Sequence, residues 1–270
     1  MDQLVKYLTG NTFKVYRASG LPFTNPLLKQ DRDTISVQLA KCLYQIYNRN
    51  RSKYDEDFVV RYNSYRAIQQ EIGITSGSFD DIQFVNIKSR NGRLLPRQTL
   101  VFSRKGDQET ILLNRVTSNR EINECLLHTL QLLTNTLFVD YIFPPHFIPL
   151  LINKLLPFFE NDLRLVYEIH QTELLNNVEI DIDYPDVKLL RLDSSGDHLY
   201  ESICRFMYNS SKIRFDRLSI KKFVSDVMNI CNDGRVRFNT VDVDKNELFI
   251  LELIGKIHSA VGEYSAKWTV

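Results

Sequence analysis

The segment between residues 82 and 114 constrains the fold most strongly, because it twice joins an alternating stretch to a turn signal. Residues 82–88 alternate, and Asn91-Gly92 is the strongest short signal for a β-hairpin. Residues 93–95 would begin the return strand. A second hairpin is expected around Lys105-Gly106-Asp107, with strands at residues 99–104 and 110–114. Two consecutive hairpins predict an antiparallel β-meander over about residues 82–114.

Helical patterns flank the predicted meander on both sides. Upstream, Asp33 or Thr34 would cap a helix whose apolar face runs from Ile35 to Tyr47. Downstream, Asn119 is a good N-cap for an apolar stripe that continues to Phe138. Further elements are expected as helices at residues 2–8, 64–72, 144–159 and 163–175, and as strands at residues 12–17 and 57–62.

The C-terminal part of the chain mixes strand and helix signals. Strands are predicted at residues 178–184, 187–192 and 235–238, and helices at residues 197–208, 216–231 and 246–262. The expected fold class is therefore α+β, with a central antiparallel meander flanked by helices, a helical middle and a C-terminal strand-helix region. Two domains are expected, residues 1–176 and 177–270, with a single domain as the alternative.

Composition places the chain among folded proteins of an ordinary kind. It has 270 residues, of which 43% are hydrophobic and 25% charged. Plentiful Asn, Ile, Leu and Tyr are typical of an AT-rich coding sequence, as in many viruses, so a protein of viral type is expected. The N-terminus lacks the basic stretch and apolar core of a signal peptide. An intracellular place is expected, in the cytoplasm or nucleus of a host cell or in association with virions.

Neither the cysteines nor the most apolar segment carries a signal for a metal site or a membrane span. Cys42, Cys125, Cys204 and Cys231 lie far apart without zinc-site spacing, which predicts buried reduced thiols. The apolar segment 137–159 is interrupted by charges and prolines, so no uncharged run reaches the roughly 18 residues that a membrane span needs. The sequence predicts no transmembrane segment.

Two segregated blocks of opposite charge give the best lead to function. The chain has a net charge of only +1. Its basic block, within residues 88–105, consists of Lys88, Arg90, Arg93, Arg97, Arg104 and Lys105. Its acidic block, within residues 168–186, includes Glu168, Glu173, Glu179, Asp181, Asp183 and Asp186. Such blocks favour electrostatic docking of the chain to itself or to a protein partner, although the two blocks meeting within one chain is an equally physical outcome.

Nucleic-acid binding is the alternative that the basic residues suggest. Arg90 and Arg93 flank the Asn-Gly turn, where cationic side chains at a hairpin tip would grip phosphates. A second cluster of basic and aromatic residues would bind phosphates by charge and bases by stacking. It combines Arg49, Arg51 and Lys53 with Tyr44, Tyr47 and Tyr54. The near-neutral net charge argues against a dedicated nucleic-acid coat.

A metal-dependent nuclease is the third hypothesis. Glu179, Asp181 and Asp183 alternate with isoleucines, so their carboxylates would share one face of a strand. With Asp186-Val187-Lys188 the stretch resembles the acid-strand-lysine core of PD-(D/E)xK nucleases. That resemblance implies carboxylates that hold Mg²⁺ and a lysine, Lys188, that orients the attacking water.

Other catalytic signatures are absent from the sequence. It contains no GxGxxG, Walker A, HExxH or GxSxG motif, and its five histidines are scattered. We therefore expect a non-enzymatic binding or assembly protein without a cofactor or metal. Its basic face would be formed by the basic block, and its acidic face by Glu179, Asp181, Asp183 and Asp186.

Overall fold

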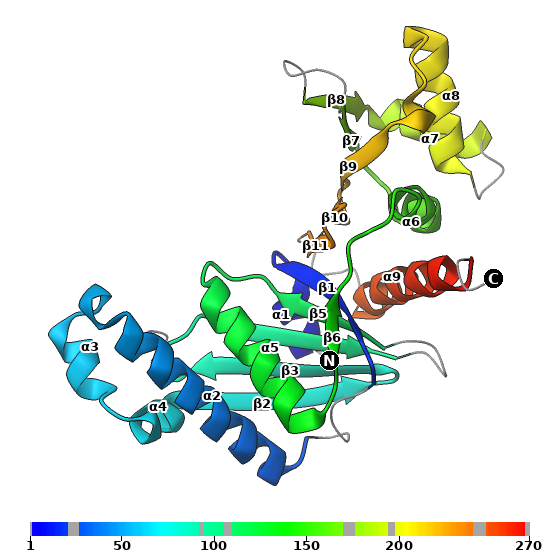
Figure 1. Cartoon of the computed structure of the whole chain (residues 1–270). Coiled ribbons are helices and arrows are strands. Elements are labelled where there is room, and N and C mark those ends of the chain that lie inside the picture. The colour runs from blue at the N-terminus through cyan, green and yellow to red at the C-terminus, as the bar shows by residue number, and fades with distance from the viewer. Residues whose placement is uncertain are drawn as a thin grey trace. The chain divides into compact units, whose positions relative to one another are not determined.

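The computed structural model describes residues 2–20, 27–91, 94–104, 110–169, 176–193, 198–239 and 247–267 (Figure 1). The chain forms two compact units. The meander unit comprises Tyr16–Val139, and the terminal unit comprises Met1–Val15 together with Asp140–Val270. Strands β1 (Thr12–Ala18) and β6 (Phe138–Asp140) each contain a boundary between the units.

The meander unit is built on an antiparallel sheet. Its strands pair in the order β2-β3-β4-β5. Their bounds are β2 Ile72–Phe79, β3 Ile82–Ser89, β4 Gln98–Ser103 and β5 Thr110–Arg115. The registers Val85↔Leu100 and Val101↔Leu113 align the last three strands. The expected α+β class with a central antiparallel meander is confirmed.

Helices cover one face of this sheet. Their bounds are α2 Lys29–Arg49, η1 Arg51–Lys53, α3 Glu56–Arg61, α4 Tyr65–Glu71 and α5 Arg120–Thr134. Helices α2 and α5 lie across the strands (Figure 1). Leu39 and Leu43 of α2 and Leu126 of α5 are fully buried in one cluster with Ile87 and Phe102 of the sheet. Asn119 caps α5 as expected, since its side chain accepts a hydrogen bond from the Ile122 N–H at 3.2 Å.

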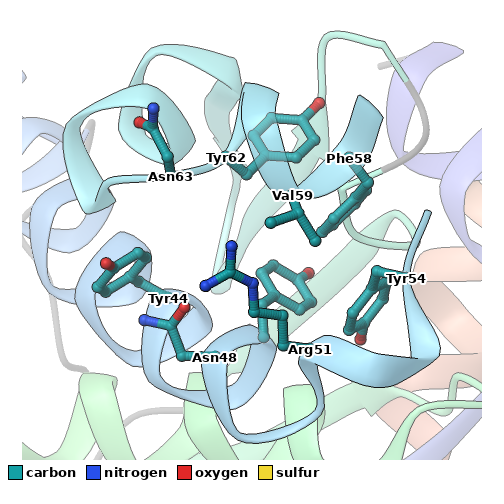
Figure 2. Close-up of a pocket in the computed structure, with 9 residues that line it drawn as sticks. Tyr44, Asn48, Arg51, Tyr54, Phe58, Val59, Tyr62 and Asn63 are labelled. Carbon is teal, nitrogen blue, oxygen red and sulfur yellow. The ribbon is translucent and has the colours of Figure 1, made fainter. Parts of the chain in front are cut away.

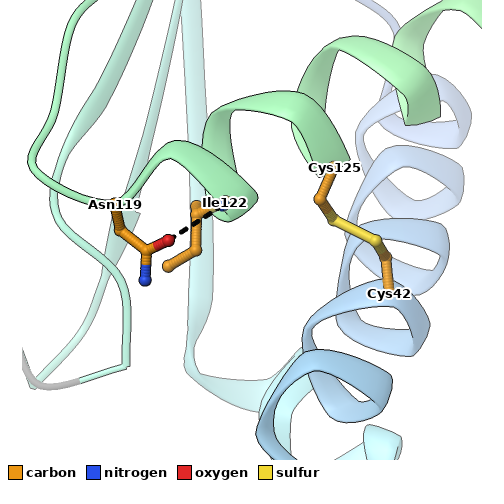
Figure 3. Close-up of a disulfide and its surroundings, with 4 residues drawn as sticks. All are labelled: Cys42, Asn119, Ile122 and Cys125. Carbon is orange, nitrogen blue, oxygen red and sulfur yellow. Dashed lines mark hydrogen bonds between the residues drawn. A yellow bond between two sulfur atoms is a disulfide. The ribbon is translucent and has the colours of Figure 1, made fainter. Parts of the chain in front are cut away.

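A disulfide joins the two long helices of the meander unit. Cys42 of α2 and Cys125 of α5 are bonded, with their Cα atoms 6.3 Å apart (Figure 3). The expectation of reduced thiols is wrong for this pair, because helix packing brings together residues that are 83 positions apart in the sequence. Cys204 and Cys231 are free cysteines.

The terminal unit contains a second antiparallel arrangement of strands. They follow one another in the order β1-β11-β10-β9-β7-β8. Their further bounds are β7 Leu163–Glu168, β8 Asn177–Ile182, β9 Ser219–Val224, β10 Met228–Cys231 and β11 Arg235–Phe238. A turn at Asn232-Asp233-Gly234 joins β10 to β11, and Gly234 has a φ of +85° there.

One face of this second sheet is apolar and packs against the core of the terminal unit. Phe13, Leu165 and Phe223 are fully buried on it, and Phe223 contacts the Phe159 ring at 5.6 Å between centroids. The unit's helices are α1 Asp2–Leu8, α6 Phe147–Leu155, η2 Leu156–Phe158, α7 Tyr184–Asp193, α8 Leu199–Ser211, η3 Phe215–Arg217 and α9 Glu247–Lys267.

Several predicted helices are strands in the structure. Residues 163–168 form β7, and residues 219–231 form β9 and β10. A register shift between Val166 and Tyr167 pairs Val166 with Lys222 but Tyr167 with Ile220. This bulge puts Ile220 and Phe223, three residues apart, among the buried side chains, so the apolar spacing imitates a helix.

Other predicted elements are also corrected. Residues 56–61 form helix α3 instead of a strand, because the Asp55 carboxylate accepts from the Phe58 N–H at 2.7 Å and caps it. The strand predicted at residues 187–192 lies in helix α7. The return strand of the first hairpin begins at Gln98 rather than Arg93. Gly92 and Arg93 lie outside the described residues, as does the turn at Lys105-Gly106-Asp107.

Strand β2 was not anticipated from the sequence. Its two glycines, Gly73 and Gly77, are poor strand formers. Gly77 pairs with Phe84, and a Cβ atom at Gly77 would lie 2.5 Å from the Phe84 ring. The Phe84 ring therefore covers the glycine, and the missing side chain is what makes room for it.

The domain boundary expected near Asn176-Asn177 falls within the terminal unit, between the paired strands β7 and β8. Compactness does not test which segments fold independently, so that boundary stays a prediction. No helix in the described part of the chain is both long and apolar enough to cross a bilayer.

Candidate functional site

The second face of the terminal-unit sheet is polar, and it carries two rows of side chains across the strands. Pairing partners lie on the same face of a sheet, so the registers define the rows directly. The first row is Thr12, Arg237, Asn229, Val224, Arg164 and Asp181. The second row is Lys14, Arg235, Cys231, Lys222, Val166 and Glu179.

Basic side chains dominate this surface, which we call the cationic sheet face. It comprises Arg164, Lys221, Lys222, Arg235 and Arg237, from strands β7, β9 and β11. These residues line a hollow of about 620 Å³. Neighbouring strands are about 4.8 Å apart, so the first row covers about 15 Å from Arg237 to Arg164.

Three of the five cations have partners within the terminal unit. Arg164 donates to the Asp181 carboxylate at 2.5 and 3.2 Å. Its hydrogen bond to that carboxylate raises the pKa of Arg164. The Arg235 guanidinium lies 2.7 Å from a carboxylate oxygen of Asp233, and Lys221 Nζ donates to the Asn177 side chain at 3.1 Å.

Lys222 and Arg237 differ from the other three cations. Among the described residues, no carboxylate forms an ion pair with either of them. Arg237 is exposed and Lys222 is half-buried. A positive charge without a protein counter-ion is available to an anion from outside, and neutralising it costs no existing ion pair. These two residues are the centre of the candidate site.

A free thiol lies between the cations. Cys231 pairs with Lys222 on one side and with Arg235 on the other. Burial raises the pKa of the Cys231 thiol, and the Asp233 carboxylate raises it further. Lys222 and Arg235 oppose this effect without reversing it. The thiol is therefore protonated at neutral pH and acts as a neutral part of the surface.

The basic block from the sequence does not gather into one face. Lys88, Arg90 and Arg97 are exposed at one end of strands β3 and β4. Arg104 is exposed at the opposite end of β4, where its N–H donates to the Asp81 carbonyl at 2.9 Å. Seven residues of extended chain separate Arg97 from Arg104 by about 24 Å. Arg93 and Lys105 lie outside the described residues.

The end of the meander that holds Arg97 also contains a cation that sequence reasoning missed. Arg115 of β5 donates to the Arg97 carbonyl at 3.0 Å. Burial lowers the pKa of Arg115, and the charge of Arg97 lowers it further. Glu71 lies at this end too, because its carboxylate accepts from Asn91 at 2.8 Å and from Arg61 at 2.9 Å.

The acidic block is partly neutralised within its own sheet. Glu179 and Asp181 are exposed on β8, and Arg164 of the neighbouring strand forms ion pairs with both. Asp183 is exposed between β8 and α7, and its carbonyl accepts the Asp186 N–H at 2.9 Å. Asp186 lies in the first turn of α7. Arg164 precedes the acidic block in the sequence. It pairs with Glu179 and Asp181 because residues 163–168 form strand β7 beside β8.

The element that the nuclease hypothesis needs is not formed. Asp186 and Lys188 are two positions apart on a helix, so their side chains diverge by about 200° instead of sharing a strand face. Within the described ranges, no group of three or more His, Cys, Asp or Glu side chains is placed to hold a metal ion.

The cationic sheet face was missed because three of its strands, β7, β9 and β10, lie in segments predicted to be helical. Residues 216–231 were expected to be helical, which would have separated Lys222 from Arg237. The alternation of Arg235 and Arg237 with buried Val236 and Phe238 was the signal that could have found it. No protein-family model matches this chain, and the search of curated proteins found no match either.

Proposed function

We propose that this protein is a non-enzymatic binding protein that holds single-stranded nucleic acid by its phosphate backbone on the cationic sheet face. The observation that carries the proposal is that Lys222 and Arg237, within a surface of five basic residues, form no ion pair with any other residue that the structure describes. Phosphate contacts supply most of the non-specific affinity of proteins for nucleic acids.

The composition of the face favours backbone contacts over base readout. No aromatic ring is among the described residues that line the hollow, so these residues offer no stacking platform. Val166, Val224 and Val236 are the valines of its lining. Asn229 and Thr12 supply polar groups that suit phosphate and sugar oxygens. The expected binding is therefore independent of base sequence.

The shape of the site favours a single strand. The cations lie on the surface of a sheet, in a hollow that would follow a backbone, and not on a projecting helix that would enter a groove. The row of about 15 Å is long enough to contact a few successive phosphates of a single strand.

Binding of a fluorescently labelled oligonucleotide tests the proposal. Lys222→Glu combined with Arg237→Glu should weaken binding at least about tenfold, because two phosphate contacts become repulsive. Lys6→Glu combined with Lys29→Glu is the matched control, since these exposed lysines on α1 and α2 change the net charge equally. Equal affinity of the two double variants would refute the proposal. A duplex that binds more tightly than a single strand would refute the preference for single strands.

Self-association through the charge blocks is a second candidate. One observation favours it: Lys88 and Arg90 on the meander unit and Asp183 on the terminal unit are all exposed. Sedimentation at low and high salt would test it. Oligomers that dissociate with salt and are lost in Arg90→Glu would support this candidate, and a monomer at every salt concentration would remove it.

A further inference from the structure

A pocket in the meander unit lies outside the proposed binding face. It measures about 80 Å³ (Figure 2). One water molecule needs about 10–15 Å³ of such volume, so the pocket has room for more than a single water molecule. It is lined by Tyr44, Tyr47, Asn48, Arg51, Tyr54, Phe58, Val59, Tyr62 and Asn63. Tyr44, Tyr47 and Tyr54, which the sequence grouped with Arg51, are thus brought together.

The local structure explains how the pocket forms. Tyr44, Tyr47 and Asn48 occur at helical spacing near the end of α2, and Arg51 follows in η1. Helix α3 supplies Phe58, whose ring stacks on Tyr54 at 4.6 Å and meets Tyr47 edge-on at 5.2 Å. The Tyr47 hydroxyl donates a hydrogen bond to the Leu94 carbonyl, and this bond holds the Tyr47 ring in place in the pocket.

Most polar groups of the pocket, apart from the Tyr47 hydroxyl, have no hydrogen-bond partner among the described residues. Within the described part of the chain, the side chains of Arg51, Asn48 and Asn63 have no hydrogen-bond or ion-pair partner. The Tyr62 hydroxyl is buried with no hydrogen-bond partner among the residues that the structure describes, and Tyr62 is only 5% exposed. Figure 2 shows the Arg51 guanidinium among the rings, with Tyr44 and Asn48 on one side and Tyr54 and Phe58 on the other.

These features define the chemistry of a ligand. Aromatic faces favour a planar ring, and carboxamides complement a ring edge that carries both donors and acceptors. Aromatic pockets also hold quaternary ammonium groups, but the Arg51 charge would repel them and no carboxylate is among the described residues that line this pocket. The volume of about 80 Å³ favours one ring over two fused rings.

We infer that this pocket binds a single pyrimidine base, stacked on the tyrosine rings and hydrogen-bonded by Arg51, Asn48 and Asn63. The base belongs either to a free nucleotide or to an unstacked position of a single strand. The inference does not depend on the cationic sheet face, because the two sites share no residue.

Calorimetric titration of the full chain with uridine 5′-monophosphate tests the inference, with ribose 5-phosphate as the probe that lacks the base. The nucleotide should bind at least about tenfold more tightly, because only it can stack. Saturation transfer from tyrosine protons should reach the uracil ring. Equal binding of the two probes would overturn the inference.

Variants connect the binding to the pocket. Arg51→Ala and Tyr54→Leu should each weaken nucleotide binding about tenfold, whereas Arg49→Ala, an exposed arginine outside the pocket, should not. Equal affinity in Arg51→Ala and Arg49→Ala would overturn the inference. Circular dichroism and the melting temperature verify folding, and exposed Arg51 gives a variant that leaves the core intact.

Two further arms separate the source of the base and the two sites. A short oligouridylate that binds more tightly than the mononucleotide, and loses that advantage in Arg51→Ala, identifies the base as part of a strand. Equal affinities identify a free nucleotide. The Lys222→Glu, Arg237→Glu variant should keep mononucleotide binding. Loss of mononucleotide binding in this variant would show that the pocket is not the nucleotide site. If the wild-type protein binds the mononucleotide but not the oligonucleotide, the proposed function is wrong and the inference about the pocket stands.

Discussion

Cys231 is the residue that reports most directly on the cationic sheet face. Its thiol lies between Lys222 and Arg235 in one row, yet burial keeps its pKa raised. Two nearby cations alone would stabilise the thiolate. The balance shows that desolvation outweighs the charges here, which is the opposite of what a reactive cysteine requires.

Alkylation should therefore be slow at Cys231 and should depend on both pH and ligand. The thiolate fraction rises as pH approaches the raised pKa, so the rate with iodoacetamide should keep increasing above the pH at which an ordinary cysteine thiol is already ionised. A saturating oligonucleotide should protect the thiol by covering it. Peptide-level mass spectrometry would follow the modification. Fast reaction at neutral pH, or no protection by the oligonucleotide, would contradict this account of the residue.

At the scale of single elements, the turn between β10 and β11 places Arg235 and Arg237 in register with Cys231 and Asn229. Gly234 holds this turn with a φ of +85°. A Cβ atom there would overlap the Tyr141 carbonyl oxygen. The backbone is in contact on both sides, because the Gly234 carbonyl also accepts the Val15 N–H at 2.9 Å.

Gly234→Ala should consequently lower the free energy of unfolding by at least about 2 kcal/mol, through the left-handed backbone and the overlap together. Gly255→Ala is the matched control, since it lies within α9 and its new Cβ would meet nothing within 4 Å. That change should stabilise the protein by about 0.5–1 kcal/mol, because alanine favours a helix. Denaturant unfolding would measure both. Similar stabilities of the two variants would show that the turn is not constrained as described.

The disulfide between α2 and α5 is a second element-level constraint. It closes a long loop, with 83 positions between Cys42 and Cys125. Restricting the unfolded chain in this way should contribute about 2–4 kcal/mol to stability. Reductant should thus lower the melting temperature of the wild type. The Cys42→Ala, Cys125→Ala variant should already be destabilised and should not respond. A wild-type melting curve that ignores reductant would contradict the prediction.

The elements that the sequence predicted well are those with local signals. The β3, β4 and β5 strands alternate or are flanked by turn residues, and α5 begins at its Asn119 cap. The β9 strand failed because a bulge against β7 breaks the period of two, and the bulge is created by a non-local partner. The same limit applies to the sites. Tyr44, Tyr47, Arg51 and Tyr54 are near in sequence and were grouped, whereas Lys222 and Arg237 share one face only through strand pairing.

At the scale of the whole molecule, a net charge of +1 hides local segregation. The basic and acidic blocks of the sequence did not predict where like charges gather in the structure. The basic block divides between two ends of one sheet, and Arg164 neutralises part of the acidic block. The cationic sheet face instead collects residues from three strands. Proteins close to neutral overall can hold nucleic acid when their cations share one face, since salt screens the acidic side chains that lie more than about 10 Å away.

The salt dependence of oligonucleotide binding tests this central claim most directly. Four phosphate contacts on a single strand should give a slope of about −3 in a plot of log affinity against log salt concentration, or about a fifty-fold loss between 50 and 200 mM salt. The Lys222→Glu, Arg237→Glu variant should lose at least about half of that slope, while the Lys6→Glu, Lys29→Glu control keeps it. A wild-type affinity that does not change with salt, or a slope shared by all three proteins, would contradict the account.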